Sequence, residues 1–330
     1  MFVLKTRIMS ENQLVYSPQS RFKFPNPTVM KTFLFSLLFT LLSAALMAQT
    51  PVALKLNLEK GKTYTIKSTA KQAMQQSVAG QSMVVNITMN RVVHFKMLGM
   101  ENDVLELEIK FDTVAMKMSA AMYSKETNST KPGTDPVDRI MYKMGLYPLK
   151  AKFSTAGKFI NFSNYDQYKA NVMMVIDSLP DSKKDDAKKQ AEMLLKESAL
   201  RSIVEPFFIH LTDKAVKTND TWEASYITTS NDMSFLVFNT YVLKGVENGQ
   251  ALLTGTSEME SMSSSNPMIK MDQPVKGSST FEGRVDLTTG MMLTNSDKGH
   301  TEGTLTLNNN GTDLKVDLKI DQQSETILVK

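Results

Sequence analysis

The sequence contains no cysteine and only three histidines, His94, His210 and His300. The absence of cysteine excludes a disulfide framework, thiolate metal sites and a lipid-anchored N-terminal cysteine. The histidines form no His-x-x-x-His or Glu-x-x-His pattern, so a zinc site is not indicated. Neither a Gly-x-Ser-x-Gly elbow nor a glycine-rich phosphate loop occurs among the 15 glycines. We therefore expect a protein that is not an enzyme and needs no cofactor.

An excess of charge of one sign is also missing once the N-terminal segment is set aside. The chain has 38 Lys and Arg against 34 Asp and Glu, but five of those basic residues and only one acidic residue lie within residues 1–48. In residues 49–330 the numbers of basic and acidic residues are equal. Binding to nucleic acid needs net positive charge or a basic stripe, so nucleic acid is not an expected partner.

Residues 30–48 have the pattern of a secretory signal peptide. A Met-Lys start, an apolar stretch and a run of small residues follow one another, and cleavage after Ala48 or after Ala45 fits this pattern. Residues 1–29 are polar and fit no signal region, which favours translation from Met30, with 1–29 an untranslated or disordered extension. We expect a periplasmic or secreted protein; a membrane anchor at this segment is the alternative.

Alternation of apolar and polar residues dominates the mature chain, residues 49–330. The odd positions from Met83 to Met97 are apolar, with Arg91 as the one exception. Leu105 to Phe111 repeats the pattern, and its parity then flips, which predicts a β-bulge near Asp112-Thr113. Such long alternating runs are typical of antiparallel strands with one wet and one apolar face.

The pattern as a whole predicts a mainly β (α+β) fold. We expect a long curved antiparallel sheet or an incomplete barrel, made from two similar β-rich halves, 52–163 and 214–330, with a helical insert, 164–205, packed against it. Three short matches in the same order indicate that the halves are duplicated: 60–64 with 218–222, 95–103 with 241–249, and 153–160 with 285–292.

Capping and turn residues predict where several elements begin. Asp135 is placed to cap a short helix that starts with proline, and Asn164 to cap a helix that ends near Ser178. A second helix is expected from about Asp181 to about Val204. Asn310-Gly311 is the strongest hairpin signal in the chain.

Several of these short motifs resemble an uncharacterised family of exported β-rich proteins of Gram-negative bacteria. They are the glutamine after the signal, the Gly-Lys-Thr-Tyr start at 61–64, the Asn-Asp-Thr-Trp step at 219–222 and the segment from Phe281 to Gly290. The resemblance covers about 52–330 and implies no assigned activity. The implied architecture is similar to that of LolA-type periplasmic carriers of lipids and lipoproteins.

Methionine is the one abundant unusual residue, with 20 of the 24 in the mature chain. Its flexible thioether suits an irregular core or an adaptable apolar surface. Pairs such as Met116-x-Met118, Met259-x-x-Met262 and Met268-x-x-Met271 leave copper(I) binding as an alternative.

The function expected from these features is that of a non-enzymatic envelope protein that binds a lipid or another apolar small molecule on one sheet face. The residues expected to line that face are Met83, Val85, Ile87, Met89, Phe95, Leu107, Phe111, Met116 and Met118. A structural or protein-interaction scaffold without ligand, with a protein partner in the envelope, is the alternative.

Overall fold

A computed structural model describes residues 50–329 except 79, 231–232, 265, 267, 272 and 310–311. The predicted extension 1–29, the predicted signal peptide 30–48 and the Asn310-Gly311 turn lie outside the described residues.

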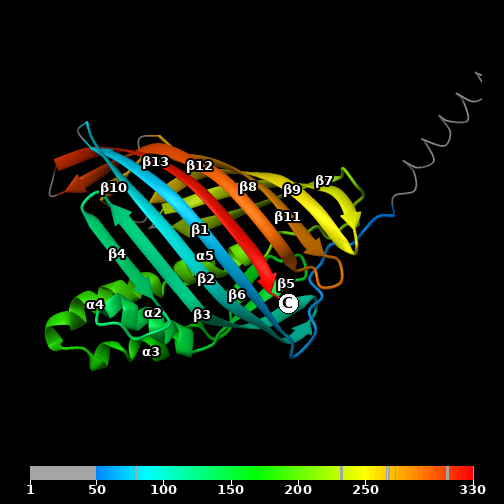
Figure 1. Cartoon of the computed structure of the whole chain (residues 1–330), viewed down its shortest axis with the longest axis horizontal. Helices are drawn as coiled ribbons and strands as arrows, with labels where there is room; N and C mark the ends of the chain where they lie inside the picture. Colours follow the sequence, from blue (N-terminus) through cyan, green and yellow to red (C-terminus); the bar gives the residue numbers. More distant parts are fainter. Residues whose placement is uncertain are drawn as a thin grey trace, which may run out of the picture. The chain divides into compact units, whose positions relative to one another are not determined.

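The described chain forms one long-stranded antiparallel sheet, as the alternation predicts (Figure 1). The order across the sheet is β6-β5-β3-β2-β1-β13-β12-β11-β9-β8-β7, with β4 on β3 and β10 on β12. The strands are β1 Thr63–Val78, β2 Gln81–Glu101, β3 Val104–Ala120, β4 Tyr123–Asn128, β5 Leu149–Ser154, β6 Phe159–Phe162, β7 Thr221–Ser230, β8 Met233–Glu247, β9 Gln250–Ser264, β10 Ile269–Lys270, β11 Lys276–Asp286, β12 Met292–Asn309 and β13 Thr312–Val329. Within the described residues β6 and β7 do not pair, so the sheet is curved but not closed.

The helices pack on one side of this sheet, and α2 contacts β3 and β4 (Figure 1). They are α2 Pro136–Leu146, α3 Tyr165–Met173, α4 Asp181–Leu194 and α5 Glu197–Val204, with short 3₁₀ turns η1 Ile176–Ser178 and η2 Glu205–Phe207. In the described part of the chain, none of the helices combines the length and the apolar character needed to cross a membrane.

Local predictions are confirmed at two places and wrong at two others. Asp112 is the extra residue of a bulge between β2 and β3, and the Asp135 carboxylate accepts a hydrogen bond from the Val137 backbone amide at 2.8 Å. Asn164 does not cap α3, because its side-chain oxygen accepts from the Lys150 backbone amide instead. The helix expected from Asp181 to Val204 is broken after residue 194 into α4 and α5.

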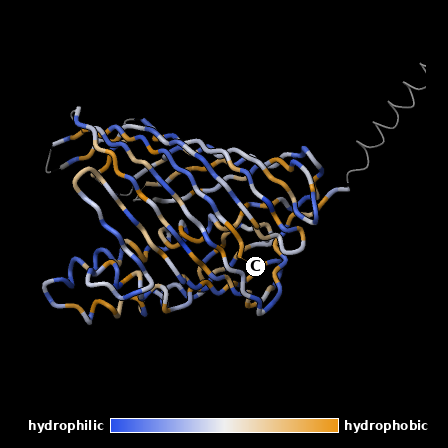
Figure 2. The backbone as a smooth tube through the Cα atoms, in the orientation of Figure 1, coloured by the Kyte–Doolittle hydropathy of each residue, from blue (hydrophilic) through white to orange (hydrophobic). Residues whose placement is uncertain are grey.

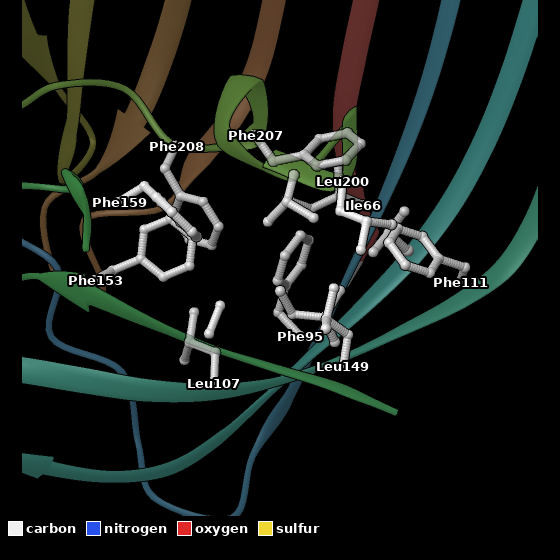
Figure 3. Packing of buried hydrophobic residues seen from close by; sticks show 14 of the residues in the cluster. Ile66, Phe95, Leu107, Phe111, Leu149, Phe153, Phe159, Leu200, Phe207 and Phe208 are labelled. Atoms are coloured by element: carbon white, nitrogen blue, oxygen red, sulfur yellow. The ribbon is translucent and has the colours of Figure 1, made fainter. Parts of the chain in front are cut away.

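The concave face changes character along the strands. At one end a large apolar cluster joins the sheet to the helices, and Phe95, Phe153, Phe207 and Phe208 meet ring against ring within it (Figure 3). At the other end lies a small second cluster: Met233, Phe235, Val275 and Leu305. Between them the inward side chains are mostly polar, and Figure 2 shows how hydropathy changes along single strands.

The two predicted halves repeat specific backbone hydrogen bonds. The amide of Gly61 donates to the carbonyl of Met97 at 2.7 Å, and the amide of Asn219 donates to the carbonyl of Leu243 at 2.6 Å. Both donors have positive φ, 83° and 72°. The strand order β1-β2-β3-β5-β6 also matches β7-β8-β9-β11-β12, since each set consists of consecutive neighbours. These matches are what a duplicated unit would give, and the duplication stays a prediction.

Candidate functional site: a polar cavity on the concave face

A cavity of about 460 Å³ lies where the polar band of the sheet faces the end of the helical segment. Its floor comes from β2, β1, β13, β12, β11, β9, β8 and β7, and its roof from Ser202 and residues 205–210, which run from α5 through η2. Ring contacts fix this roof on both sides: Phe207 packs on Phe95 of β2, and His210 packs on Tyr226 of β7 at 4.8 Å between ring centroids. The cavity is therefore built from both halves and from the helical segment between them.

A row of paired polar residues crosses the floor of this cavity. Strand register places Arg91 beside Ser68, Ser68 beside Thr326, and Thr326 beside Asn295. The Arg91 Nη2 donates to the Ser68 hydroxyl at 3.3 Å, and the Thr326 hydroxyl donates to the same oxygen at 3.3 Å. Ser68 and Thr326 are buried. The register thus holds a guanidinium, two hydroxyls and an amide in one line inside the protein.

Two atoms of this row are buried without a hydrogen-bond partner among the described residues: Arg91 Nε and Asn295 Oδ1. Burial lowers the pKa of Arg91 from its ordinary value. An unpaired buried polar atom costs about 1–3 kcal/mol, and more when the group is charged. The row that borders the cavity therefore contains a donor and an acceptor without partners among the described residues.

The roof carries its own charged group, and this one is fully paired. Arg201 contacts both oxygens of the Glu205 carboxylate, at 2.8 and 2.9 Å, and His210 Nε2 lies 3.8 Å from the same group. Burial alone would raise the pKa of Glu205, but the favourable contacts with His210 and Arg201 outweigh it and hold that pKa below its usual value. The ion pair therefore neutralises the roof.

A second acidic side chain faces the cavity from β12. Asp297 accepts a hydrogen bond from the Ser279 hydroxyl at 2.9 Å. Burial raises the pKa of Asp297 above its ordinary value, and the bond from Ser279 only partly opposes this effect. Aromatic rings complete this wall: Trp222 stacks on Tyr241, and Tyr241 meets Phe281 edge to face, each at 5.3 Å between centroids. The lining is therefore both aromatic and polar.

The structure separates the nine residues that were predicted to line a ligand face into two groups. Phe95, Leu107 and Phe111 are fully buried members of the large apolar cluster (Figure 3). They fill the interior and line neither this cavity nor the second one described below.

The other six lie further along the same face of β2 and β3. The register places Met89 beside Met116 and Ile87 beside Met118. Val85 is buried and Met83 is 49% exposed. Ile87 is among the residues that line a second cavity, of about 800 Å³, which adjoins the first and shares Gln72, Ser257, Ser279, Gln322 and Gln323 with it. A ligand-lining role for these residues stays a prediction.

The other candidate groups are dispersed. Within the described ranges, no three His, Asp or Glu side chains are arranged to hold a metal ion. Of the methionine pairs, Met259 and Met271 pack against the second apolar cluster, whereas Met262 and Met268 are more than half exposed. Copper(I) binding stays a prediction without a defined set of ligands.

Sequence analysis identified only one residue of the polar row. Arg91 is the exception to the apolar alternation of β2, and this was the available signal. Its neighbours were not recognisable, because Ser68 and Thr326 are separated by 258 residues and neither side chain is unusual in its own strand.

The fold and the cavity define a protein with an open, curved antiparallel sheet and a hollow between the sheet and its helical segment. The profile of a family of unknown function, DUF6263, matches residues 102–312. The chain therefore belongs to this family. No curated protein sequence matches the chain significantly.

Several solved structures resemble the chain distantly. A structure of lipovitellin that describes lipid–protein interactions has a TM-score of 0.46 at 11% identity, and the match covers 83% of this chain but 26% of that one. An outer membrane channel from Pseudomonas putida F1 has a TM-score of 0.19 at 6% identity (83% and 98% covered), and the outer membrane protein OprG from Pseudomonas aeruginosa has 0.22 at 7% (82% and 97%). This chain spans about a quarter of the lipovitellin chain. TM-scores below 0.5 carry no argument about function, and the expected similarity to LolA-type carriers stays a prediction.

Proposed function

We propose that the mature chain is an exported, non-catalytic binding protein of the cell envelope, periplasmic or secreted, that takes an amphipathic small molecule such as a lipid into its concave face. The observation that carries this proposal is the cavity of about 460 Å³ between the sheet and residues 202–210. Ligand pockets typically have volumes of about 300–1,000 Å³ and combine apolar walls with a few placed polar groups.

The arrangement along the strands supports an amphipathic ligand over a purely apolar one. The cavity lies in a polar band, with the large apolar cluster at one end of the strands and the second apolar cluster at the other. A molecule with both a polar and an apolar part could place its polar part in the polar band and its apolar part toward one of the apolar clusters. A wholly apolar ligand would leave the buried polar atoms of the Arg91 row unpaired.

The non-catalytic part of the proposal rests on the state of the charged groups. The Glu205 carboxylate is occupied by both nitrogens of the Arg201 fork, and His210 lies edge-on against Tyr226. Groups held in this way stabilise the roof of the cavity and are poorly placed for proton transfer.

One observation favours the alternative, a scaffold without ligand. The bulky apolar residues of β2 and β3 that were expected to line an open groove, Phe95, Leu107 and Phe111, are packed in a filled interior. If the cavity holds only water, the sheet would serve to present its outer face or its edge strands to a protein partner.

Native mass spectrometry of the mature protein purified from an envelope fraction, with organic extraction, tests the proposal. The informative variant is Ser257→Phe, which places a ring at a cavity-lining position of β9. The control is Ser263→Phe, at an exposed position of the same strand that lines neither cavity. We expect a stoichiometric adduct on the wild type and on the control, and no adduct on Ser257→Phe, with unchanged circular dichroism for all three.

Two results would decide against this function. A clean mass for the wild type, with no uptake of added oleate or phosphatidylglycerol, would leave the scaffold as the working function. Uptake of copper(I) alone, lost on replacement of Met116 and Met118 by Leu, would favour the metal alternative.

A further inference from the structure

Arg91 is a partly buried positive charge of the cavity, and it has no acidic partner in the described part of the chain. Its guanidinium makes one hydrogen bond, to the Ser68 hydroxyl, and lies 5.1 Å from the centroid of the Phe207 ring. Its Nε is buried and unpartnered. The contact with Phe207 orients the guanidinium plane and provides some cation–π attraction, but it does not neutralise the charge.

Arg201, which pairs with Glu205 of the roof, shows how a paired arginine is held beside the same cavity. Its fork is taken up by both carboxylate oxygens of Glu205. Asp297, the other acid of the cavity, accepts a hydrogen bond from Ser279 and forms no ion pair with Arg91 in the described part of the chain. Desolvating a charge without a counterion is unfavourable, and an anion that enters the cavity would offset this cost.

The surroundings of Arg91 suit an oxyanion. Five N–H donors in a planar fork match the oxygen pairs of carboxylates and phosphates. The Ser68 hydroxyl, which accepts from Arg91 and Thr326, still has its own proton to donate. Along β2, the inward residues that follow Arg91 toward the second apolar cluster are Met89, Ile87 and Val85, and β3 adds Met116 and Met118 beside the first two. A charged head at Arg91 would thus have an apolar path leading away from it.

We propose that Arg91 binds the oxyanion head, a carboxylate or a phosphate, of an amphiphile whose apolar part lies along Met89, Ile87 and Val85. This inference rests on the proposed function and specifies its ligand class. It also gives a binding role to the β2 and β3 methionines that the sequence singled out, while Phe95, Leu107 and Phe111 remain core residues.

Equilibrium binding to the mature protein tests it with three probes: oleate, oleyl alcohol, which has the same chain without the charge, and inorganic phosphate. The variant is Arg91→Met, which keeps the length of the side chain and removes the guanidinium. The control is Arg284→Met, which removes an exposed arginine from β11 and changes the net charge equally. We expect oleate to bind the wild type and Arg284→Met, and to bind Arg91→Met at least ~10-fold more weakly. Oleyl alcohol should bind all three within ~3-fold of one another.

Thermal unfolding provides the second readout. Because the charge is unpaired, Arg91→Met without ligand should melt no lower than the wild type, whereas oleate should raise the melting temperature of the wild type and not that of the variant. A large loss of stability in the unliganded variant would identify Arg91 as a structural residue and overturn the inference.

The outcomes separate this inference from the proposed function. Equal oleate affinity in the wild type and in Arg91→Met overturns the role of Arg91 and leaves the amphiphile function standing. Binding of phosphate alone, lost in Arg91→Met, overturns the amphiphile function and retains Arg91 as an anion site. Absence of binding for all three probes overturns both.

Discussion

The first and second β-rich segments share a backbone plan but not an interior. Each begins with a residue of positive φ whose amide bonds across to the second strand, and each has a register shift at the same place, between Met97 and Gly99 in the first and between Leu243 and Gly245 in the second. Counted from the hairpin turns at 102–103 and 248–249, which precede these strands, Phe111 of β3 corresponds to Ser257 of β9. One side chain fills the large apolar cluster, whereas the other lines the cavity.

The neighbouring positions differ in the same direction. Val93 corresponds to Asn239 and Ile109 to Gly255, where the freed space is taken by the ring of Phe281. Removing side-chain volume from a close-packed interior leaves a void unless something refills it. The comparison teaches that this fold makes a cavity by reducing side-chain size on one segment while the strands and turns stay the same.

The largest loss of stability is expected when Phe111 of the first segment is replaced by serine, the residue at the corresponding position of the second segment. We expect Phe111→Ser to lower the free energy of unfolding by roughly 3–5 kcal/mol, because it empties a fully buried site and leaves a hydroxyl in apolar surroundings. Urea unfolding measures the loss, with the milder Phe111→Leu as a second variant if the first does not fold. Ser257→Ala should cost less than ~1 kcal/mol; equal losses at both positions would contradict the contrast.

The ion pair in the roof gives the next largest effect. Arg201→Ala leaves the Glu205 carboxylate buried and without its main partner, and we expect a loss of about 3 kcal/mol at pH 7. The pKa of Glu205 is depressed in the folded protein, so its stabilisation is present above the unfolded value of 4.5 and is lost as the pH falls through the folded pKa.

The difference in the free energy of unfolding between the wild type and Arg201→Ala should therefore narrow as the pH falls from 7 to 4, because protonation of Glu205 removes the buried charge in the variant. Unfolding curves at pH 7 and pH 4 measure this change. A gap that is independent of pH would mean that Arg201 acts through packing alone. Glu205→Gln combined with Arg201→Ala is the matched control, and its loss should be smaller than that of Arg201→Ala alone.

Two serines test whether a hydrogen bond from a backbone amide to a serine hydroxyl contributes equally to stability in the two segments. The Ser129 hydroxyl accepts from the Val114 amide at 2.7 Å, and the Ser261 hydroxyl accepts from the Val275 amide at 2.8 Å. Each Ser→Ala change leaves a backbone amide without this partner and should cost about 1–3 kcal/mol. Similar losses in urea unfolding are expected; a loss at one site only would show that the two bonds differ in importance.

The smallest effect is expected at the exposed end of the predicted ligand face. Met83 is half exposed near the start of β2, so Met83→Ser should change the free energy of unfolding by no more than ~0.5 kcal/mol. Val85, the next inward residue, is buried, so the matched change Val85→Ser should lower the free energy of unfolding clearly more. Equal effects would indicate that Met83 is covered in solution, for example by a partner.

Much of the fold was predictable because local residue periodicity determines it. The alternation from Leu105 to Phe111, its parity flip at Asp112 and the Asp135 cap each depend on neighbours within a few residues. The break between α4 and α5 was missed, and so was the role of Asn164, which bonds to a strand 14 residues away instead of to its own helix.

The site was less predictable for the same physical reason. Its lining comes from strands that are far apart in sequence, and polar residues such as Ser68 or Asn295 look like ordinary strand residues until the register brings them into one row. Only Arg91 carried a local signal, since a charge at an inward position interrupts an otherwise apolar pattern.

The pairing of β1 with β13 sets the order in which the molecule can be completed. These two strands run side by side over 14 residue pairs, from Thr65 with Val329 to Val78 with Val316. They form the junction between the two segments and also carry half of the polar row. Such distant partners make folding slow, because the chain must close a very long loop before the contacts form. The polar row therefore cannot form until synthesis has reached the far end of β13, and a chain stopped before that strand would have two separate sheets, each with a bare edge open to aggregation.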